Sequence, residues 1–177
     1  MRQIFDEKEM FEVIKKLAKE IVDKENLDKL VLIGIKRRGV PIAYRISEEI
    51  KKINGREVPV GEVDITFYRD DLQLINETPV VRGSNINFDI KDKVVILVDD
   101  VLYTGRTVRA AMDEILEWGR PKKIKLCVLI DRGHRELPIC ADYVGKKINT
   151  TLDEIVEVKV KEYDGENKVI VVKKGEI

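Results

Sequence analysis

Apolar residues recur every three or four positions between residues 6 and 24, and this spacing predicts an amphipathic helix. Asp6 and Glu9 stand three positions apart at the start of the pattern and fit a capping box. A wholly apolar run at residues 30–35 then predicts a buried strand, and a second helical pattern extends from Pro41 to about Ile53. The first third of the chain therefore predicts helix, strand and helix in that order.

The same alternation continues along the chain. Further strands are predicted at residues 58–67, 94–98 and 124–130, a third helix at about residues 107–118, and a C-terminal β-hairpin at residues 155–160 and 169–172. Buried strands that alternate with amphipathic helices are typical of an α/β fold built on a mainly parallel sheet.

Two segments lack a regular pattern. Residues 68–92 are mostly polar and predict a long loop, which a compact domain tolerates when the loop has a function such as closing over a site. Residues 131–152 are interrupted by glycines and a proline, and they predict a cap region without regular structure. Because no repeat or linker divides the sequence, we expect residues 1–177 to form a single domain.

Composition narrows the possible function classes. The 177 residues include 33 Lys or Arg and 33 Asp or Glu, so the net charge is zero and any face that binds nucleic acid must be local. Cys127 and Cys140 lack the spacing of zinc ligands, which indicates reduced thiols. The sequence has no run of 18 apolar residues and begins with a charged segment, so we expect a soluble, cytoplasmic protein.

Chemically unusual segments follow three of the predicted strands. They are residues 36–39, residues 99–107 and Asp131-Arg132. Ligands of open parallel sheets bind at the carboxyl ends of the strands, so we expect these three segments to meet at one edge of the sheet.

The central segment, VDDVLYTGRT at residues 98–107, has two chemically distinct halves. Backbone N–H groups, threonine hydroxyls and the dipole of the following helix can together hold a phosphate monoester, and Gly105 lets the backbone approach it closely. Asp99 and Asp100 can accept hydrogen bonds from a vicinal diol. A sugar phosphate matches both halves.

Plainer interpretations of these residues remain open. Asp99 can simply end a strand, and Thr104 can simply cap a helix. An acidic pair after a strand also binds a metal in receiver domains, but it stands near the start of such a domain, whereas this pair lies past the middle of the chain. The patterns GxxxxGK[ST] and GxGxxG are absent from the sequence, which disfavours NTP-binding and dinucleotide-binding sites.

The basic sequence Lys36-Arg37-Arg38-Gly39 has two interpretations. It can be a solvated turn. Beside a phosphate site, it can instead supply cations and backbone amides to a second, more highly charged anion such as pyrophosphate. A ribose that carries both a 5-phosphate and a 1-pyrophosphate fits all of these features, with Mg²⁺ to offset the charge of the leaving group.

The stretch VILVDDVLYTGRT resembles the phosphoribosyl pyrophosphate (PRPP) signature of type I phosphoribosyltransferases. The segments DITFYRDDL, VRAAMDEI, GRP and DRGHRELPI are similar to those of the PyrR family of bifunctional pyrimidine operon regulators and uracil phosphoribosyltransferases. The similarity extends from the first helix to the terminal hairpin. It implies a type I phosphoribosyltransferase fold with a cap, or hood, and a reaction in which uracil and PRPP give UMP and pyrophosphate with Mg²⁺.

The resemblance also implies roles for individual residues. The PRPP- and UMP-binding set is Lys36, Arg37, Arg38, Gly39, Val98, Asp99, Asp100, Val101, Leu102, Tyr103, Thr104, Gly105, Arg106 and Thr107. The proposed catalytic set is Asp99 and Asp100, which hold the ribose hydroxyls near Mg²⁺, with Arg69 and Arg82 of the lid loop, which otherwise read as ordinary surface arginines. Uracil is expected near Ile130, Asp131 and Arg132, where backbone groups recognise it.

The regulatory half of the resemblance implies UMP-dependent binding of a pyrimidine operon mRNA leader by a homodimer or larger homo-oligomer. Candidate RNA contacts are Lys15, Lys16, Lys19, His134 and Arg135, although the three lysines also fit the solvated face of an amphipathic helix. Cys140 stands where the family has an arginine, and the lysines of the first helix also depart from the family pattern.

Three functions remain open at this point. The first is a uracil phosphoribosyltransferase that also regulates transcription through RNA. The second is an RNA-binding regulator that uses the pocket only to sense UMP. The third is a phosphoribosyltransferase for another base, such as hypoxanthine or orotate, because the PRPP segment is shared while the cap selects the base.

Overall fold

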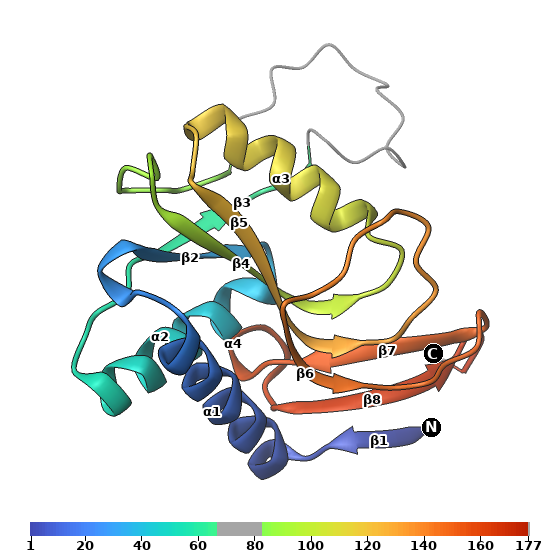
Figure 1. Ribbon diagram of the computed structural model, residues 1–177. Coiled ribbons are helices and arrows are strands. Elements are labelled where there is room, and N and C mark those ends of the chain that lie inside the picture. The colour runs from blue at the N-terminus through green and yellow to red at the C-terminus, as the bar shows by residue number, and fades with distance from the viewer. Residues whose placement is uncertain (67–82, 177) are drawn as a thin grey trace.

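Figure 1 shows the computed structural model, which describes residues 1–66 and 83–176. The strands are β1 (Arg2–Phe5), β2 (Leu30–Ile35), β3 (Val60–Val63), β4 (Val94–Leu102), β5 (Lys123–Asp131), β6 (Tyr143–Lys147), β7 (Glu154–Lys159) and β8 (Lys168–Lys173). The helices are α1 (Glu7–Lys24), α2 (Gly39–Asn54), α3 (Arg106–Trp118) and the single turn α4 (Lys161–Asp164), with a 3₁₀ turn at Leu27–Lys29. Among these helices, none is both long enough and apolar enough to cross a membrane.

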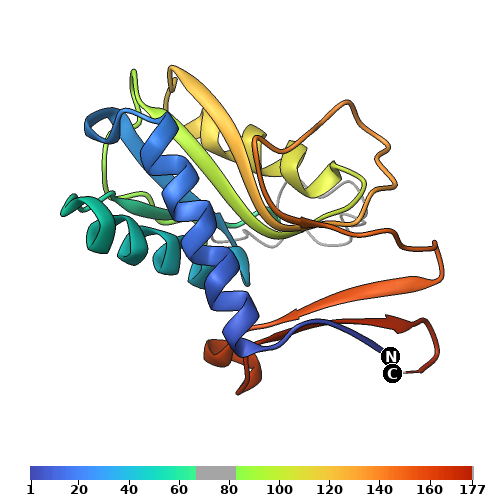
Figure 2. The ribbon, with the colours of Figure 1, turned by 60° about the horizontal axis from the view of Figure 1, so that its bottom comes forward.

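Two sheets organise the chain. The central sheet is parallel throughout, in the order β3-β2-β4-β5-β6, and a smaller antiparallel sheet has the order β1-β8-β7. Figures 1 and 2 show α1 and α2 on one face of the central sheet, α3 on the other, and the small sheet beside the carboxyl end of β4.

The central sheet is buried on both faces. Leu32 and Ile96 pack in an apolar cluster with α1 and α2, whereas Ile33 and Leu97 pack in a second cluster with α3. Successive side chains of a strand point to opposite faces, so a strand covered on both faces must be apolar at every position. This explains the uninterrupted apolar runs in the sequence.

Several sequence predictions are confirmed. The capping box of α1 is present, because the Asp6 side chain accepts from the Glu9 N–H at 2.8 Å and the Glu9 side chain accepts from the Asp6 N–H at 2.9 Å. The predicted strand at residues 30–35 coincides with β2, and α2 and α3 begin within two residues of their predicted starts.

Strand β4 is longer than predicted, since it continues from residue 98 to Leu102. Asp99 and Val101 keep the parallel ladder with β5, opposite Val128 and Ile130. The acidic pair therefore lies within a strand rather than after its end. The backbone pairing with β5 decides where the strand stops, and the change from apolar to charged side chains does not mark that point.

The sequence pattern did not predict β1 or β6. Residues 143–147 were assigned to a cap without regular structure, and that assignment is wrong because they form the edge strand β6, parallel to β5. Gly145 permits this packing, since a Cβ at this position would lie 2.4 Å from the carbonyl oxygen of Leu129. Strand β1 pairs with β8 and completes the small sheet.

Strand β3 is shorter than the predicted strand at residues 58–67. The predicted lid, residues 68–92, extends too far toward the C-terminus, because Ile86 and Ile90 are buried in the same apolar cluster as α3. Asn85 also forms an isolated antiparallel bridge with Glu62. The remainder of the predicted lid, up to residue 82, lies outside the described residues.

Candidate active site

The segments that follow β2, β4 and β5 meet at the carboxyl edge of the central sheet, as the sequence predicts. Gly39 lies so close to β4 that a Cβ there would stand 2.4 Å from the carbonyl oxygen of Val98. The N–H of Arg132 donates to the carbonyl oxygen of Leu102 at 3.1 Å. The acidic strand β4 therefore contacts both the basic loop and the cap directly.

Asp99 and Asp100 occupy different environments at this edge. Asp99 is buried, and its Oδ1 accepts from the N–H of Asp100 at 2.8 Å. Asp100 is half-buried, its Oδ1 accepts from the N–H of Val101 at 2.8 Å, and it lines a cavity of about 400 Å³ with Arg38 and residues of β7. Asp100 is thus the member of the pair that faces an open space.

Burial raises the pKa of Asp99 well above its ordinary value, and the neighbouring Asp100 carboxylate adds to this effect. Because the folded-state pKa is raised, the protonated carboxyl group contributes stability that is complete below the unfolded pKa of about 3.9 and is lost as the pH rises through the folded-state pKa. The site therefore carries a carboxylate whose ionisation opposes folding.

We expect Asp99→Asn to raise the Tm of the free protein at neutral pH. The amide oxygen can still accept from the Asp100 N–H, and the neutral side chain removes the cost of ionisation. The gain in Tm should appear above about pH 4 and grow as the pH rises through the folded-state pKa. Thermal unfolding of both proteins from pH 4 to pH 8 measures this, and a Tm difference that does not change with pH would contradict it.

Residues 103–107 form the turn that leads from β4 into α3. Gly105 has a φ of 93°, which favours glycine, and it stands at the N-cap of the helix. The Oγ1 of Thr104 accepts from the N–H of Arg106 at 3.2 Å, and the Thr107 side chain is exposed on the first helical turn. A helix start with hydroxyls and a close backbone has the chemistry of an anion site.

The Lys36–Gly39 loop contacts two residues that the sequence argument missed. Arg38 forms an ion pair of 2.7 Å with Asp164, and the guanidinium carbon of Arg37 lies 4.4 Å from the ring centre of Tyr163. Tyr163 and Asp164 belong to the predicted hairpin turn, where an aromatic and an acidic residue carry no special signal. Only the fold shows which cations they meet.

The side chains of Asp131 and Arg132 are engaged inside the protein. Both oxygens of Asp131 accept from Nη2 of Arg135 at 2.8 Å. Arg132 donates to two backbone carbonyls of residues 151–154 at 3.0 Å each, and its guanidinium carbon lies 4.0 Å from the ring centre of Tyr103. A base bound here would meet backbone groups rather than these side chains.

Arg135 was a candidate RNA contact, but its guanidinium points inward. Besides Asp131, it donates to the carbonyl oxygens of Tyr103 at 2.7 Å and Ile139 at 2.9 Å. The residue therefore joins the turn before α3 to the cap. The candidate role in RNA binding would require these three internal contacts to open.

Within one chain, the structure does not gather the candidate RNA contacts on one surface. Lys15, Lys16 and Lys19 lie on the exposed face of α1, each 3.4–3.8 Å from a carboxylate of the same helix. His134 is exposed in the cap, where Ile139 packs with the α3 cluster, whereas α1 packs on the other face of the central sheet.

The remaining site predictions concern lid residues and a metal. Arg69 and Arg82 lie outside the described residues. Over residues 1–66 and 83–176, no group of three or more His, Cys, Asp or Glu side chains is arranged to hold a metal ion. A cation beside Asp99 and Asp100 would therefore need further oxygen donors from a ligand.

Comparison with known proteins shows the family to which this chain belongs. The family model described as "Phosphoribosyl transferase domain" matches residues 1–165. A Clostridioides difficile "Bifunctional protein PyrR" is 54% identical over 170 residues, with 96% of each chain covered. The protein of the same name from Acetivibrio thermocellus is 55% identical over 170 residues, which cover 96% of this chain and 92% of that one. The chain belongs to the PyrR family. Its membership confirms the resemblance seen in the sequence, so uracil phosphoribosyl transfer and pyrimidine operon regulation are the functions of its family.

Solved structures confirm the fold of this PyrR-family chain. A hypoxanthine-guanine phosphoribosyltransferase of Bacillus anthracis superposes with a TM-score of 0.71 at 22% identity, covering 98% of both chains. The hypoxanthine phosphoribosyltransferase of Trypanosoma cruzi gives a TM-score of 0.73 at 20% identity, covering 98% of this chain and 97% of that one. At such identities the likeness establishes the type I phosphoribosyltransferase fold and leaves the base to other arguments.

Proposed function

We propose that this protein transfers the phosphoribosyl group of PRPP to uracil. A bond forms between N1 of uracil and C1 of the ribose, the bond from C1 to pyrophosphate breaks, and the N1 proton is released, which leaves UMP and pyrophosphate. The observation that carries the proposal is the meeting of a basic loop, an acidic pair and a helix N-terminus at one sheet edge of a PyrR-family chain.

Each part of PRPP has complementary groups at this edge. Asp99 and Asp100 accept hydrogen bonds from the ribose hydroxyls. Residues 104–107 hold the 5-phosphate through backbone N–H groups, hydroxyls and the dipole of α3. The loop of residues 36–39 faces the pyrophosphate, whose charge its side chains offset. Catalysis then consists mainly of positioning and of stabilising the charge on the leaving group.

Mg²⁺ fits this site if oxygen atoms of PRPP complete the coordination of the ion. Asp99 and Asp100 offer the carboxylate oxygens that Mg²⁺ prefers, but the described residues add no third ligand of this kind to the pair. The bound ion would offset the charge that develops on the departing pyrophosphate. Arg69 and Arg82 of the lid segment are our candidates for cations that act beside it.

We propose that uracil binds below the cap, near Ile130, Asp131 and Arg132. The internal contacts of the Asp131 and Arg132 side chains support recognition through backbone groups. Bases differ in the donors and acceptors along their edges, and a rigid backbone pattern can select one of them. Hypoxanthine and orotate are the bases to compare.

A base-selectivity assay tests the enzymatic proposal. Purified protein is given Mg²⁺, PRPP and one base at a time, and pyrophosphate release is measured against a variant that carries both Asp99→Asn and Asp100→Asn. We expect release with uracil that the double variant lacks. If uracil causes no release above that of the double variant, the pocket serves only to sense UMP, and preferential release with another base would overturn the choice of uracil.

The regulatory proposal is UMP-dependent binding of a pyrimidine operon mRNA leader by a homodimer or higher homo-oligomer in the cytoplasm, which attenuates transcription. The zero net charge requires a local basic face, and the exposed lysines of α1 are the candidates for it, with RNA phosphates competing against the carboxylates of the same helix. The inward contacts of Arg135 support a structural role for that residue, with His134 as the exposed candidate in the cap.

A matched pair of charge reversals tests the α1 face. Lys16 is 62% exposed and pairs with Glu20, and Lys52 is 70% exposed and pairs with Glu49 on α2. We expect Lys16→Glu to weaken binding of a leader hairpin RNA in the presence of UMP and to reduce the slope of log K against log salt concentration by about one. Lys52→Glu should bind the RNA as the wild-type protein does. Uracil turnover should stay at the wild-type value in both. Equal weakening by both variants would assign the effect to general charge instead of this face.

A further inference from the structure

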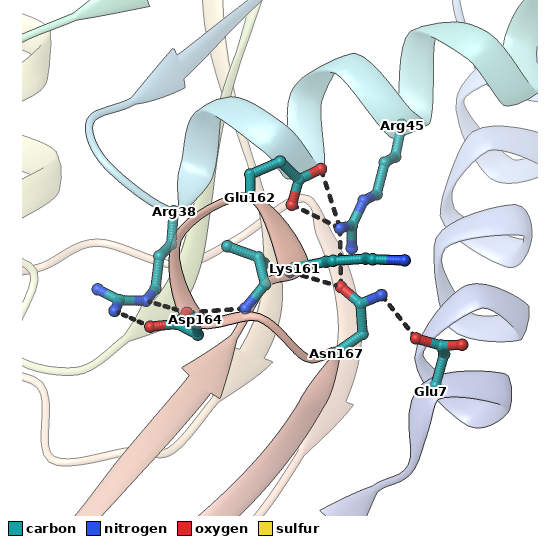
Figure 3. Close-up of polar contacts among 8 residues, drawn as sticks. Glu7, Arg38, Arg45, Lys161, Glu162, Asp164 and Asn167 are labelled. Atoms are coloured by element: carbon teal, nitrogen blue, oxygen red, sulfur yellow. Dashed lines mark hydrogen bonds and ion pairs between the residues drawn. The ribbon is translucent and has the colours of Figure 1, made fainter.

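The single helical turn α4 joins β7 to β8 beside the Lys36–Gly39 loop. Its last residue, Asp164, binds Arg38. Oδ2 of Asp164 accepts from Nε of Arg38 at 3.1 Å, and Oδ1 accepts from Nη2 at 2.7 Å (Figure 3). A bidentate pair fixes the plane of the guanidinium as well as its distance. The hydrogen bond from Arg38 lowers the pKa of Asp164, so the carboxyl group stays ionised at neutral pH.

Tyr163, which precedes Asp164 in α4, contacts Arg37, which precedes Arg38 in the loop. The guanidinium carbon of Arg37 lies 4.4 Å from the centre of the Tyr163 ring, well inside the range of about 6 Å over which a cation is attracted to an aromatic face. Two consecutive residues of α4 therefore hold two consecutive arginines of the basic loop.

The turn α4 is itself fixed from the side away from the loop. Oδ1 of Asn167 accepts from the N–H of Lys161 at 2.9 Å and from Nη2 of Arg45 at 2.8 Å, and its Nδ2 donates to Glu7 at 2.8 Å. Glu162 accepts from Arg45 as well, at 2.8 and 3.0 Å (Figure 3). These contacts tie α4 to α2 and to the first turn of α1. The positions of Tyr163 and Asp164 are therefore fixed by contacts that do not involve the loop.

We propose that Tyr163 and Asp164 are positioning residues, which present Arg37 and Arg38 to the pyrophosphate group of PRPP. The inference rests on the proposed function of the Lys36–Gly39 loop. Arg38 lines the same cavity as Asp100, so the guanidinium that Asp164 orients lies on the ribose side of the loop. A guanidinium has five N–H donors and Asp164 accepts from two of them, so one arginine can bridge Asp164 and a phosphate oxygen.

If Tyr163 and Asp164 have this role, their substitution should weaken only the binding of ligands that carry a pyrophosphate group. PRPP and free pyrophosphate need the oriented arginines, whereas UMP has only the 5-phosphate and meets the turn before α3. Loss of orientation should therefore raise the KM for PRPP and the Kd for pyrophosphate, and it should leave the Kd for UMP unchanged. A purely structural role would weaken all three ligands together.

Asp164→Asn and Glu162→Gln form the main test, because both replace an arginine-binding carboxylate of α4 by an amide. In Asp164→Asn the remaining oxygen can still accept from the N–H of Val160, which Asp164 binds at 2.9 Å. We expect a rise of about tenfold in the KM for PRPP and in the Kd for pyrophosphate, with an unchanged Kd for UMP. Glu162→Gln should change none of these constants, because Glu162 contacts no residue of the loop and Asn167 still ties α4 to Arg45 and Glu7. Equal effects of the two variants, or an equal loss of UMP affinity, would overturn the proposal.

Tyr163 is tested by a pair of substitutions that separate the ring from its hydroxyl. Tyr163→Phe keeps the aromatic face under Arg37 and should keep the wild-type KM for PRPP. Tyr163→Leu removes that face and should raise the KM about threefold, in line with an exposed cation–π contact. A rise in Tyr163→Phe equal to that in Tyr163→Leu would rule out the ring contact as the cause.

Arg38→Gln separates this inference from the proposed function on which it rests. If Arg38→Gln leaves the KM for PRPP and the Kd for pyrophosphate unchanged, Arg38 does not bind pyrophosphate, so its part in the proposed function and its positioning by Asp164 both fail. If Arg38→Gln raises the KM while Asp164→Asn does not, the loop keeps its role and only the positioning inference is overturned.

Discussion

Asp100→Asn is expected to lower kcat/KM for PRPP about a hundredfold without lowering the Tm. The variant keeps Oδ1, which accepts from the N–H of Val101 at 2.8 Å, so the local backbone retains its hydrogen bond. It loses the charge and one acceptor oxygen on the side that faces the cavity shared with Arg38. Each hydrogen bond to a charged group contributes about 1.5–3 kcal/mol, and a ribose diol can make two of them.

The control removes one negative charge elsewhere on the same part of the fold. Asp113 lies on the exposed face of α3, 3.6 Å from Arg109, and Asp113→Asn should keep the wild-type kcat/KM. Steady-state kinetics with varied PRPP and a thermal melt of each variant give the comparison. If kcat/KM for PRPP falls by less than about threefold in Asp100→Asn, a change of under 1 kcal/mol, Asp100 does not bind the ribose.

The two aspartates differ in their expected effects on stability. Asp99→Asn should stabilise the free protein because burial and the Asp100 carboxylate oppose the ionisation of Asp99, and Asp100→Asn should give a smaller gain because it removes only the contribution of Asp100. A buried carboxylate beside a second one is a cost that the fold accepts where function needs the charge. Stability and turnover should therefore move in opposite directions in Asp99→Asn.

The central sheet could be predicted because its strands are buried on both faces. Residues 30–35 are all apolar, and the structure shows why, since alternate side chains meet α1 and α2 on one face and α3 on the other. The place of the site also followed from the sequence, because the carboxyl ends of neighbouring parallel strands share one edge. The order of the elements along the chain is enough to locate this edge.

The edge strands could not be predicted from the same patterns. In β6 only Tyr143 is fully buried, so the strand lacks an apolar run, and its Gly145 reads as a breaker until Leu129 and α1 are seen to pack against it. Strand β1 has four residues and exists only because β8, far along the sequence, pairs with it. Long-range pairing of this kind leaves little local signal.

Charged residues of the site were the hardest to assign from sequence. Arg135 and Asp131, both candidate ligand contacts, bind each other across one loop, and Asp164 reaches Arg38 from 126 positions away. A sequence shows that a charge is present, but the partner that neutralises it depends on which loops the fold brings together. In the candidate site, the meeting of the three segments was therefore predictable, and the partners of their charged side chains were not.

Gly39→Ala is expected to combine a loss of stability with a large loss of turnover. The added Cβ would lie 2.4 Å from the carbonyl oxygen of Val98 and 3.2 Å from the Cα of Asp99, so α2 and β4 must move apart. Overpacking of this kind costs about 1–3 kcal/mol, and each kcal/mol lowers the Tm by about 2–4 °C in a chain of this size. The movement separates the basic loop from the acidic pair, and a displacement of about 1 Å can reduce turnover about a hundredfold.

Gly55→Ala at the other end of α2 provides the matched control. Gly55 has a φ of 81° and open space around its Cα, so alanine there costs only the left-handed backbone, about 1–2 kcal/mol. The two variants should therefore lose similar stability, but only Gly39→Ala should lose kcat/KM for PRPP when both are assayed well below their Tm. Equal retention of turnover would mean that the basic loop and the acidic pair need not stay in contact, and the proposed division of PRPP between them would then be wrong.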